Sequence, residues 1–238
     1  MARKSFKAGA LTAPLPPVMV TVGDMENANI ITIGWTGILS TIPPRTYISV
    51  RPERYSYKIL KEKREFVINL TTAKQAREVD YVGIYTGAKV DKFKECGFTK
   101  LESKEVSAPT IAECPFALEC RVIEIIPMGT HDVFIADIVS VSSDESIIDT
   151  EGKIRFDNAG LLAYAHGEYF ALGEKVGKFG FSTKKPSSKK QTQGKPADKE
   201  AKKQIPEKKT TDDKNKKRPF YLDAPRGKGG SKGRGKRK

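Results

Sequence analysis

The stretch Asn27-Ala-Asn-Ile-Ile-Thr-Ile-Gly-Trp35 decides how this 238-residue chain is expected to fold. At its centre, Ile30–Ile33 is a short run of mostly β-branched residues. Similar runs, separated by turn residues, occur on both sides of this stretch up to residue 70: Val18–Val22, Tyr47–Val50 and Phe66–Leu70. Short runs of this composition predict β-strands.

Two helices are predicted beside these strands. Ser56–Lys63 has the charged, non-β-branched composition of a short surface helix, with Ser56 as its N-cap. Apolar residues recur at helical spacing from Ala73 to Ile84, which predicts a second helix. We expect Lys89–Glu113 to be mostly connecting chain.

Alternating patterns predict two longer strands, around Leu118–Val122 and His131–Ala136, joined by a turn at Pro127–Thr130. Shorter strands are expected at Leu161–Tyr164 and Tyr169–Leu172. Many short strands, few helices and no regular βαβ alternation indicate a mainly β fold, an antiparallel barrel or sandwich.

The charge of the chain is unevenly distributed. Of its 43 basic and 29 acidic residues, 21 and 6 respectively lie after residue 183, so this tail carries about +15 and the rest about −1. We predict a folded domain over residues 1–181 and a disordered Lys/Gly-rich basic tail over 182–238, because the tail has almost nothing apolar to bury. Nonspecific nucleic-acid binding and a solubilising role both remain open for the tail.

Several classes of protein are excluded by the sequence. The three cysteines include no close pair at zinc-ligand spacing, so neither a disulfide nor a metal site is expected. Prolines interrupt the apolar residues near the N-terminus, and nowhere do ~18 apolar residues run together, so we expect a soluble, cytoplasmic protein with no membrane partner. A Gly-x-Gly-x-x-Gly loop, a Walker loop and a Ser/His/Asp signature are missing.

Seven short stretches, in a fixed order and spacing, resemble the flavin reductase-like family, in particular its flavoredoxin-like branch. They are Asn27–Trp35, Arg51-Pro-Glu-Arg-Tyr-Ser-Tyr57, Glu65-Phe-Val-Ile-Asn-Leu70, Asp91-Lys-Phe93, Pro109-Thr-Ile-Ala-Glu113, Gly129-Thr-His131 and Leu172-Gly-Glu174. The resemblance implies an FMN-binding split β-barrel, antiparallel and of Greek-key type. It also implies a homodimer, with flavin sites near the subunit interface, that moves electrons between NAD(P)H, flavin and an acceptor.

FMN requires cations or a helix N-terminus for its phosphate, polar partners for its ribityl chain and an apolar slot for its ring. Arg51 and Ser56 bracket the start of the first predicted helix, and the resemblance implies that they form a phosphate or ribityl site. The alternative is that Ser56 is only an N-cap and Arg51 only a surface charge.

The resemblance places four further residues at or near the flavin: Asn29 through its amide, Trp35 through its ring, and Thr32 and Ser40 nearby. Asn29 and Trp35 lie six residues apart, which gives them the same strand parity if no bulge intervenes. Core packing remains the alternative for Trp35. Some relatives carry a cysteine where Ser40 aligns, so a mechanism that needs a thiol there is not implied for this chain.

Three more candidates follow from the resemblance. Lys92 matches a lysine that reaches the flavin, with a solvated surface lysine as the alternative. Tyr164 matches an aromatic position near the flavin ring, with core packing as the alternative. His131 matches the family's Gly-Asp-His signature for flavin and nicotinamide binding, although Thr130 replaces the Asp. An imidazole titrates near neutral pH, so His131 is the candidate catalytic residue, with a structural role as the alternative.

Three functions therefore stay open. The first is an FMN-dependent oxidoreductase that takes electrons from NAD(P)H and passes them to free flavin, ferric iron or a redox protein. The second is an electron-transfer flavoprotein that does not use NAD(P)H directly. The third is a nucleic-acid-associated protein that acts through its basic tail.

Overall fold

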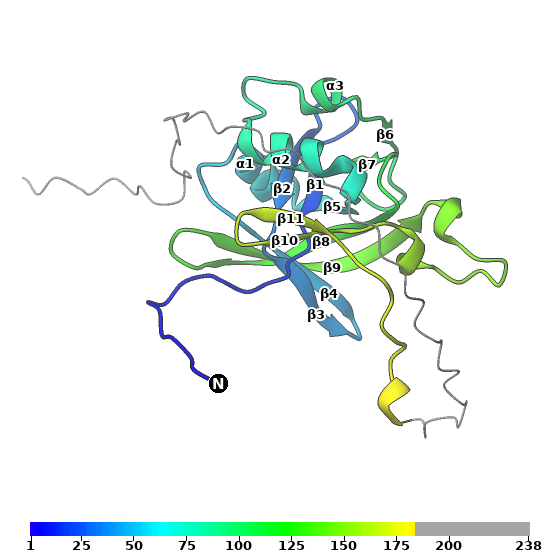
Figure 1. Ribbon diagram of the computed structural model, residues 1–238. Helices are drawn as coiled ribbons and strands as arrows, with labels where there is room; N and C mark the ends of the chain where they lie inside the picture. The colour runs from blue at the N-terminus through cyan, green and yellow to red at the C-terminus, as the bar shows by residue number, and fades with distance from the viewer. Residues whose placement is uncertain (184–238) are drawn as a thin grey trace, which may run out of the picture. The chain divides into compact units, whose positions relative to one another are not determined.

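The computed structural model describes residues 1–183. Its main sheet is antiparallel and has the strand order β2-β1-β5-β8-β9-β4-β3 (Figure 1). The strands of this sheet are β1 (Val18–Val22), β2 (Asn29–Ile33), β3 (Thr36–Thr41), β4 (Pro44–Val50), β5 (Glu65–Leu70), β8 (Phe116–Pro127) and β9 (Asp132–Ser143). The predicted mainly β, antiparallel fold is confirmed.

Shorter elements complete the described part of the chain. The helices are α1 (Tyr55–Lys63), α2 (Ala76–Ile84) and α3 (Lys92–Cys96), with 3-10 turns η1 (Ala73–Gln75), η2 (Glu145–Ile147), η3 (Phe156–Asn158) and η4 (Phe181–Thr183). Two small hairpins pair β6 (Lys100–Leu101) with β7 (Thr110–Ile111), and β10 (Leu162–Ala165) with β11 (Glu168–Ala171).

The main sheet curls around an apolar core. Val18, Val20 and Val22 of β1 belong to this core, together with buried residues of β2, β4, β5, β8 and β9. Leu60 of α1 is fully buried in the same cluster. Because six strands contribute side chains to one cluster, the interior of the barrel is filled by packed side chains.

A second apolar cluster lies on the opposite face of β1 and β2. Met19 and Ile30 point into it, where they meet Val79 and Val82 of α2 and Phe93 of α3. The three helices lie near one another in Figure 1, but only α2 and α3 pack on this face, since Leu60 of α1 belongs to the first cluster. With apolar contacts on both faces, β1 is buried along its whole length, which explains its unbroken apolar and threonine sequence.

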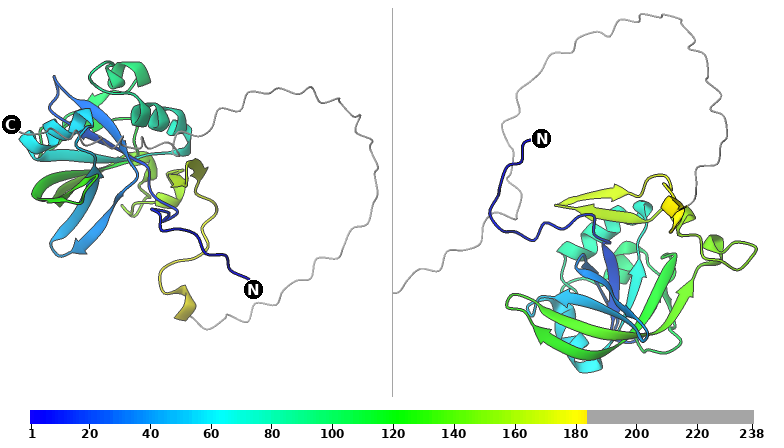
Figure 2. Two further views of the ribbon diagram at one scale, coloured as in Figure 1. Left: turned by 90° about the vertical axis from the view of Figure 1, so that its left-hand side faces the viewer. Right: turned by 90° about the horizontal axis from the view of Figure 1, so that it is seen from below.

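The β3–β4 hairpin projects from the body on the side away from the helices (Figures 1 and 2). It is an edge of the sheet, and its tip exposes Ile38, Leu39 and Ile42. β3 is not predicted from the sequence, because an edge strand on a projecting hairpin has no buried face and so no alternating pattern.

Two local expectations were wrong. Helix α1 starts at Tyr55 with Arg54 as its N-cap residue, and no side chain caps it, so Ser56 is not the N-cap. The chain bends at Gly34 and Trp35 after β2 ends, so the strand parity assumed for Trp35 does not apply. The expected connection over Lys89–Glu113 also contains α3 and the β6–β7 pair.

Candidate functional site

Two of the predicted site residues meet where β2 begins and α1 begins. Asn29 is the first residue of β2 and is 6% exposed. Its Nδ2 donates a hydrogen bond to Oγ of the buried Ser56, at 2.7 Å. Ser56 thus faces inward and ties the first turn of α1 to β2, which is why it is not available to cap the helix.

A glycine allows the chain after α2 to close over this contact. A Cβ built at Gly87 would lie 2.2 Å from Asn29 Oδ1 and 2.7 Å from Cδ1 of Tyr55. Such distances are far inside van der Waals contact, so any larger residue at position 87 would force Asn29 or the backbone to move. Gly87 carries no recognisable signal in the sequence, because its role depends on contacts that only the folded chain creates.

Lys92 lies beneath the same corner of the barrel and is 4% exposed. Its Nζ donates hydrogen bonds of 2.8 Å to the carbonyl oxygens of Ile30 and Val82. Within residues 1–183, no carboxylate forms an ion pair with it. Burial, together with the charge of Arg54, lowers the pKa of Lys92 to about 8. The alternative of a solvated surface lysine is therefore wrong.

Arg54 adds a second cation that was not singled out from the sequence, although it lies within the Arg51–Tyr57 stretch. Its guanidinium donates to the carbonyl oxygen of Gly83. Arg54 is also the residue from which α1 starts, where no acidic side chain occupies the first turn. A helix N-terminus carries a partial positive charge, so the start of α1 adds to the positive charge of Arg54 and Lys92 at this corner.

A surface pocket opens at this corner, with a volume of about 350 Å³. It is lined by Asn27, Ala28, Asn29, Tyr55, Gly87, Lys89, Val90, Asp91 and Lys92. Asn29, Lys89 and Lys92 are the donors that line it, and Asp91 is a carboxylate in the same lining. Arg54 lies at the same corner without lining the pocket, and the uncapped helix α1 begins at Tyr55 in the lining. Together these groups are donors suited to a phosphate group.

The second cluster of predicted residues is aromatic. The rings of Trp35 and His131 lie 4.6 Å apart between centroids, with 46° between their planes. Trp35 is 40% exposed, so it is not an ordinary core residue. His131 Nδ1 lies 3.0 Å from the hydroxyl of Thr130. Burial, and then the charge of Arg51, lower the pKa of His131.

The remaining predicted residues lie elsewhere. Thr32 Oγ1 donates to the carbonyl oxygen of Val79 at 2.6 Å and so joins β2 to α2. Ser40 is near the tip of the β3–β4 hairpin, where its Oγ donates to the carbonyl oxygen of Pro43. Tyr164 lies on the β10–β11 hairpin, with its ring 5.4 Å from that of Tyr169.

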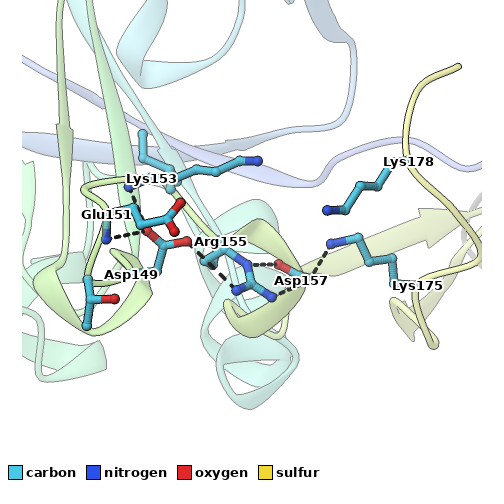
Figure 3. A pocket seen from close by; sticks show the side chains of 9 residues that line it. Asp149, Glu151, Lys153, Arg155, Asp157, Lys175 and Lys178 are labelled. Carbon is cyan, nitrogen blue, oxygen red and sulfur yellow. Dashed lines mark hydrogen bonds and ion pairs between the residues drawn. The ribbon is translucent and has the colours of Figure 1, made fainter.

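A second pocket, of about 450 Å³, lies between residues 149 and 178 (Figure 3). Arg155 reaches both Asp149 and Asp157, and Lys175 Nζ lies 2.6 Å from Asp157 Oδ2. These ion pairs join η3 to the chain after β11. The carboxylates of Asp149 and Asp157 are already matched by cations, so this pocket is an ion-pair network rather than a candidate catalytic site.

Other kinds of site were also sought among residues 1–183. The His, Cys, Asp and Glu side chains of this part form no group able to hold a metal ion. None of its helices combines the length and apolar character needed to span a bilayer. The three cysteines are unpaired, and burial raises the pKa of Cys114 to about 12.

A sequence model of the flavin reductase like domain matches residues 11–173. The chain belongs to the flavin reductase-like family. Its structure resembles that of flavoredoxin from Desulfovibrio vulgaris (Miyazaki F), with a TM-score of 0.72 and 32% identity over 77% of this chain and 100% of that one. The fold is the split barrel of this family, and the chain lies in its flavoredoxin-like branch.

Two further similarities bear on the cofactor. An FMN-binding protein from Thermus thermophilus, solved with 1-cyclohex-2-enone, is 25% identical, with a TM-score of 0.63 over 75% of this chain and 97% of that one. An NADPH-flavin oxidoreductase from Streptomyces viridifaciens is 23% identical over 133 residues, which are 54% of this chain and 68% of that protein. The chain therefore belongs to a family of flavoproteins that includes oxidoreductases.

The residues present fit a flavin. The corner of Asn29, Arg54, Ser56 and Lys92 offers cations and hydroxyl and amide donors, and Gly87 packs closely on Asn29 beside them. The exposed ring of Trp35 beside His131 offers an aromatic surface with a titratable group. A bound anion would offset the repulsion between the positive charges of Arg54 and Lys92. A flavin that carries a phosphate, such as FMN, would therefore be favoured over one without a phosphate.

Proposed function

We propose that this protein is an FMN-dependent oxidoreductase that takes electrons from NAD(P)H and passes them to free flavin, ferric iron or a redox protein. The observation that carries the proposal is the pair of cations, Arg54 and buried Lys92, at the uncapped start of α1 with no carboxylate paired to Lys92 in the described part. Two cations held close together without an anion are costly unless a ligand supplies the negative charge.

The roles of the residues follow from their chemistry. Arg54, Ser56 and the start of α1 hold the phosphate of FMN, and Asn29 orients Ser56. Trp35 packs against the ring, and Lys92 supplies positive charge. When bound, FMN supplies hydride acceptance and one-electron transfer, which no side chain of this chain provides.

His131 is proposed as the residue that faces the nicotinamide nucleotide. Its lowered pKa keeps the imidazole neutral at pH 7, so that it can donate one hydrogen bond and accept another. Arg51, whose charge acts on His131, supplies positive charge to the same nucleotide. We place Arg51 with His131 because the charge of Arg51 acts on the pKa of His131, whereas the charge of Arg54 acts on that of Lys92.

One observation favours a second function, that of an electron carrier reduced by another protein. The solved chain with 32% identity, which this chain covers completely, is named a flavoredoxin. Thr130 also stands where the family signature has an Asp, which weakens the case for nicotinamide binding.

We further propose a homodimer and a cytoplasmic location. The support for the dimer is the exposed apolar tip of the β3–β4 hairpin, where Ile42 is 93% exposed beside Ile38 and Leu39. Exposed apolar patches of this kind are typical of interaction surfaces. In the second function, a redox protein would be the partner.

An absorption spectrum of the purified protein with FMN, repeated without oxygen after adding NADH or NADPH, tests the proposal. Bound-flavin bands that bleach would support the oxidoreductase. Bound flavin that stays oxidised, but is reduced by dithionite, would support the electron carrier. Failure to bind FMN would contradict both functions.

A further inference from the structure

The two clusters of the candidate site are joined by neighbouring residues of one helix. Ser56, in the first turn of α1, contacts Asn29 of β2. The next residue, Tyr57, donates a hydrogen bond from its hydroxyl to Oδ2 of Asp132, in β9. Successive residues of a helix point about 100° apart. The first turn of α1 can therefore contact both strands at once.

Asp132 is the first residue of β9 and follows His131 directly. Its backbone pairs with Val50 of β4 and Pro127 of β8. Ends of strands open more easily than their centres, and His131 lies just outside the strand. The Tyr57 hydroxyl therefore adds an anchor to α1 at the point where the chain leaves β9 for His131.

The ring of Tyr57 is held independently of its hydroxyl. It packs edge-on against Phe134 with 5.6 Å between centroids, and Tyr57 adjoins the apolar core. The hydroxyl can be removed without emptying space in the core. What would be lost is the contact to Asp132 alone.

We propose that Tyr57 is a positioning residue, whose hydrogen bond to Asp132 fixes the His131 ring against Trp35 and couples that aromatic pair to the Asn29–Ser56 corner through α1. Its role in electron transfer rests on the function proposed above. The positioning itself does not, and it can be measured without any flavin.

The surroundings of His131 allow a direct readout. Trp35 is the chain's only tryptophan, and His131 is one of two histidines. A protonated imidazole in contact with an indole ring quenches its fluorescence, so the emission of Trp35 should titrate with His131. The other groups that act on His131 are Arg51 and Glu53 through their charges and Thr130 through its hydroxyl, and Asp132 is the next residue along the chain.

The test is the pH dependence of Trp35 emission in the full-length chain freed of flavin, compared between wild type and Tyr57→Phe. One hydrogen bond biases a two-state equilibrium about fivefold. We expect the fraction of His131 released from Trp35 to rise by about that factor, so that the pH-dependent quench shrinks. The midpoint should also move up toward that of a free histidine, because a released ring is less buried.

Matched variants distinguish a positioning role of Tyr57 from a general loosening of the folded chain. Tyr81→Phe removes a hydroxyl from α2 and keeps the ring stacked on Tyr85, so it should titrate like wild type. Asp132→Ala should reduce the quench as Tyr57→Phe does, and the double variant should add little to either. Asp132→Asn keeps an oxygen that accepts from Tyr57 and should retain most of the amplitude.

NMR of the ring protons of the two histidines gives a second measurement, with His166→Gln to assign the signals. A Tyr57→Phe variant with the same quench amplitude and the same His131 titration as wild type would overturn the proposal. If His131→Gln left the quench in place, the fluorescence would not report on His131, and the NMR titration alone would decide. A positioned His131 in a protein that fails to bind FMN would overturn the proposed function and leave this inference standing.

Discussion

At the scale of single residues, Lys92 makes the most specific prediction. Its pKa of about 8 in the folded protein lies below the usual 10.5, so between these values the folded state binds fewer protons than the unfolded state. The free energy of unfolding of the flavin-free protein should therefore rise with pH from about 8 to 10.5, by at most about 3.4 kcal/mol. FMN affinity should fall over the same range, because the cation is lost.

Chemical denaturation and FMN titration at a series of pH values measure these opposite trends. Lys92→Met should remove both pH dependences, although it also leaves the carbonyls of Ile30 and Val82 without their donor and so lowers stability at every pH. Lys58→Met, which changes an exposed lysine of α1 outside the lining of the pocket, is the control. Parallel pH profiles for wild type and Lys92→Met would contradict the prediction.

Arg54 carries a second residue-scale prediction, on the phosphate of FMN. Arg54→Met should weaken FMN binding by roughly 10- to 100-fold, the usual strength of a charged hydrogen bond, and leave riboflavin binding nearly unchanged. Fluorescence titration with each flavin measures the difference. Lys58→Met, on an exposed position of the same helix, should affect neither. Equal losses for FMN and riboflavin would show that Arg54 does not face the phosphate.

Part of the candidate site could be predicted from the sequence. The resemblance pointed to Asn29, Ser56, Trp35 and His131, which the structure does bring together in two pairs. The resemblance could not show that Lys92 is buried. Its Nζ lies between β2 and α2, where it donates to the carbonyl oxygens of Ile30 and Val82, 62 and 10 residues away in the sequence. Burial of that kind is a property of the packed chain and leaves no local pattern.

At the scale of elements, the strands with apolar patterns were predictable and the edge strand was not. β1, β2 and β5 have buried faces, so their apolar and β-branched composition predicts them as strands. β8 and β9 each run for 12 residues, about twice the predicted length, because their exposed ends continue the ladder beyond the buried alternation. Hydrogen bonding between strands continues where burial stops, and sequence patterns report only burial.

The ion pairs of Figure 3 give the prediction for this scale. Arg155 and then Lys175 hold the pKa of Asp157 well below its usual range, so Asp157 is ionised at neutral pH. Asp157→Asn should release Lys175 and loosen the exposed chain after β11. Trypsin should then cut after Lys175 several-fold faster, and wild type should approach that rate at high salt, since surface ion pairs are screened. Asp137→Asn, which breaks the ion pair of Arg45 with Asp137 on β9, should leave cleavage at Lys175 unchanged.

At the scale of the whole molecule, the division between a domain over 1–181 and a disordered tail stays a prediction, because residues 184–238 lie outside the described part. The structural similarity to flavoredoxin bears on the role of the tail. All of that solved chain is covered by 77% of this one. The fold of that solved chain therefore has no counterpart of the remaining residues, which fits a tail that adds a property instead of completing the barrel.

That property is predicted from charge. The tail carries about +15 and the rest about −1, so attraction to polyanions should belong to the tail alone. A chain ending at residue 183 should keep the unfolding temperature and FMN affinity of the full-length protein, and should lose retention on immobilised heparin.

Full-length protein should bind duplex DNA with an affinity that falls linearly in log K against log salt, because each neutralised phosphate releases counterions. A same-length variant with the tail lysines and arginines changed to glutamine separates charge from length and should behave like the truncated chain. If the truncated chain kept the steep salt dependence, the barrel itself would be the nucleic-acid-binding part, and its basic corner at Arg54 and Lys92 would have to serve phosphates of a different kind from that of FMN.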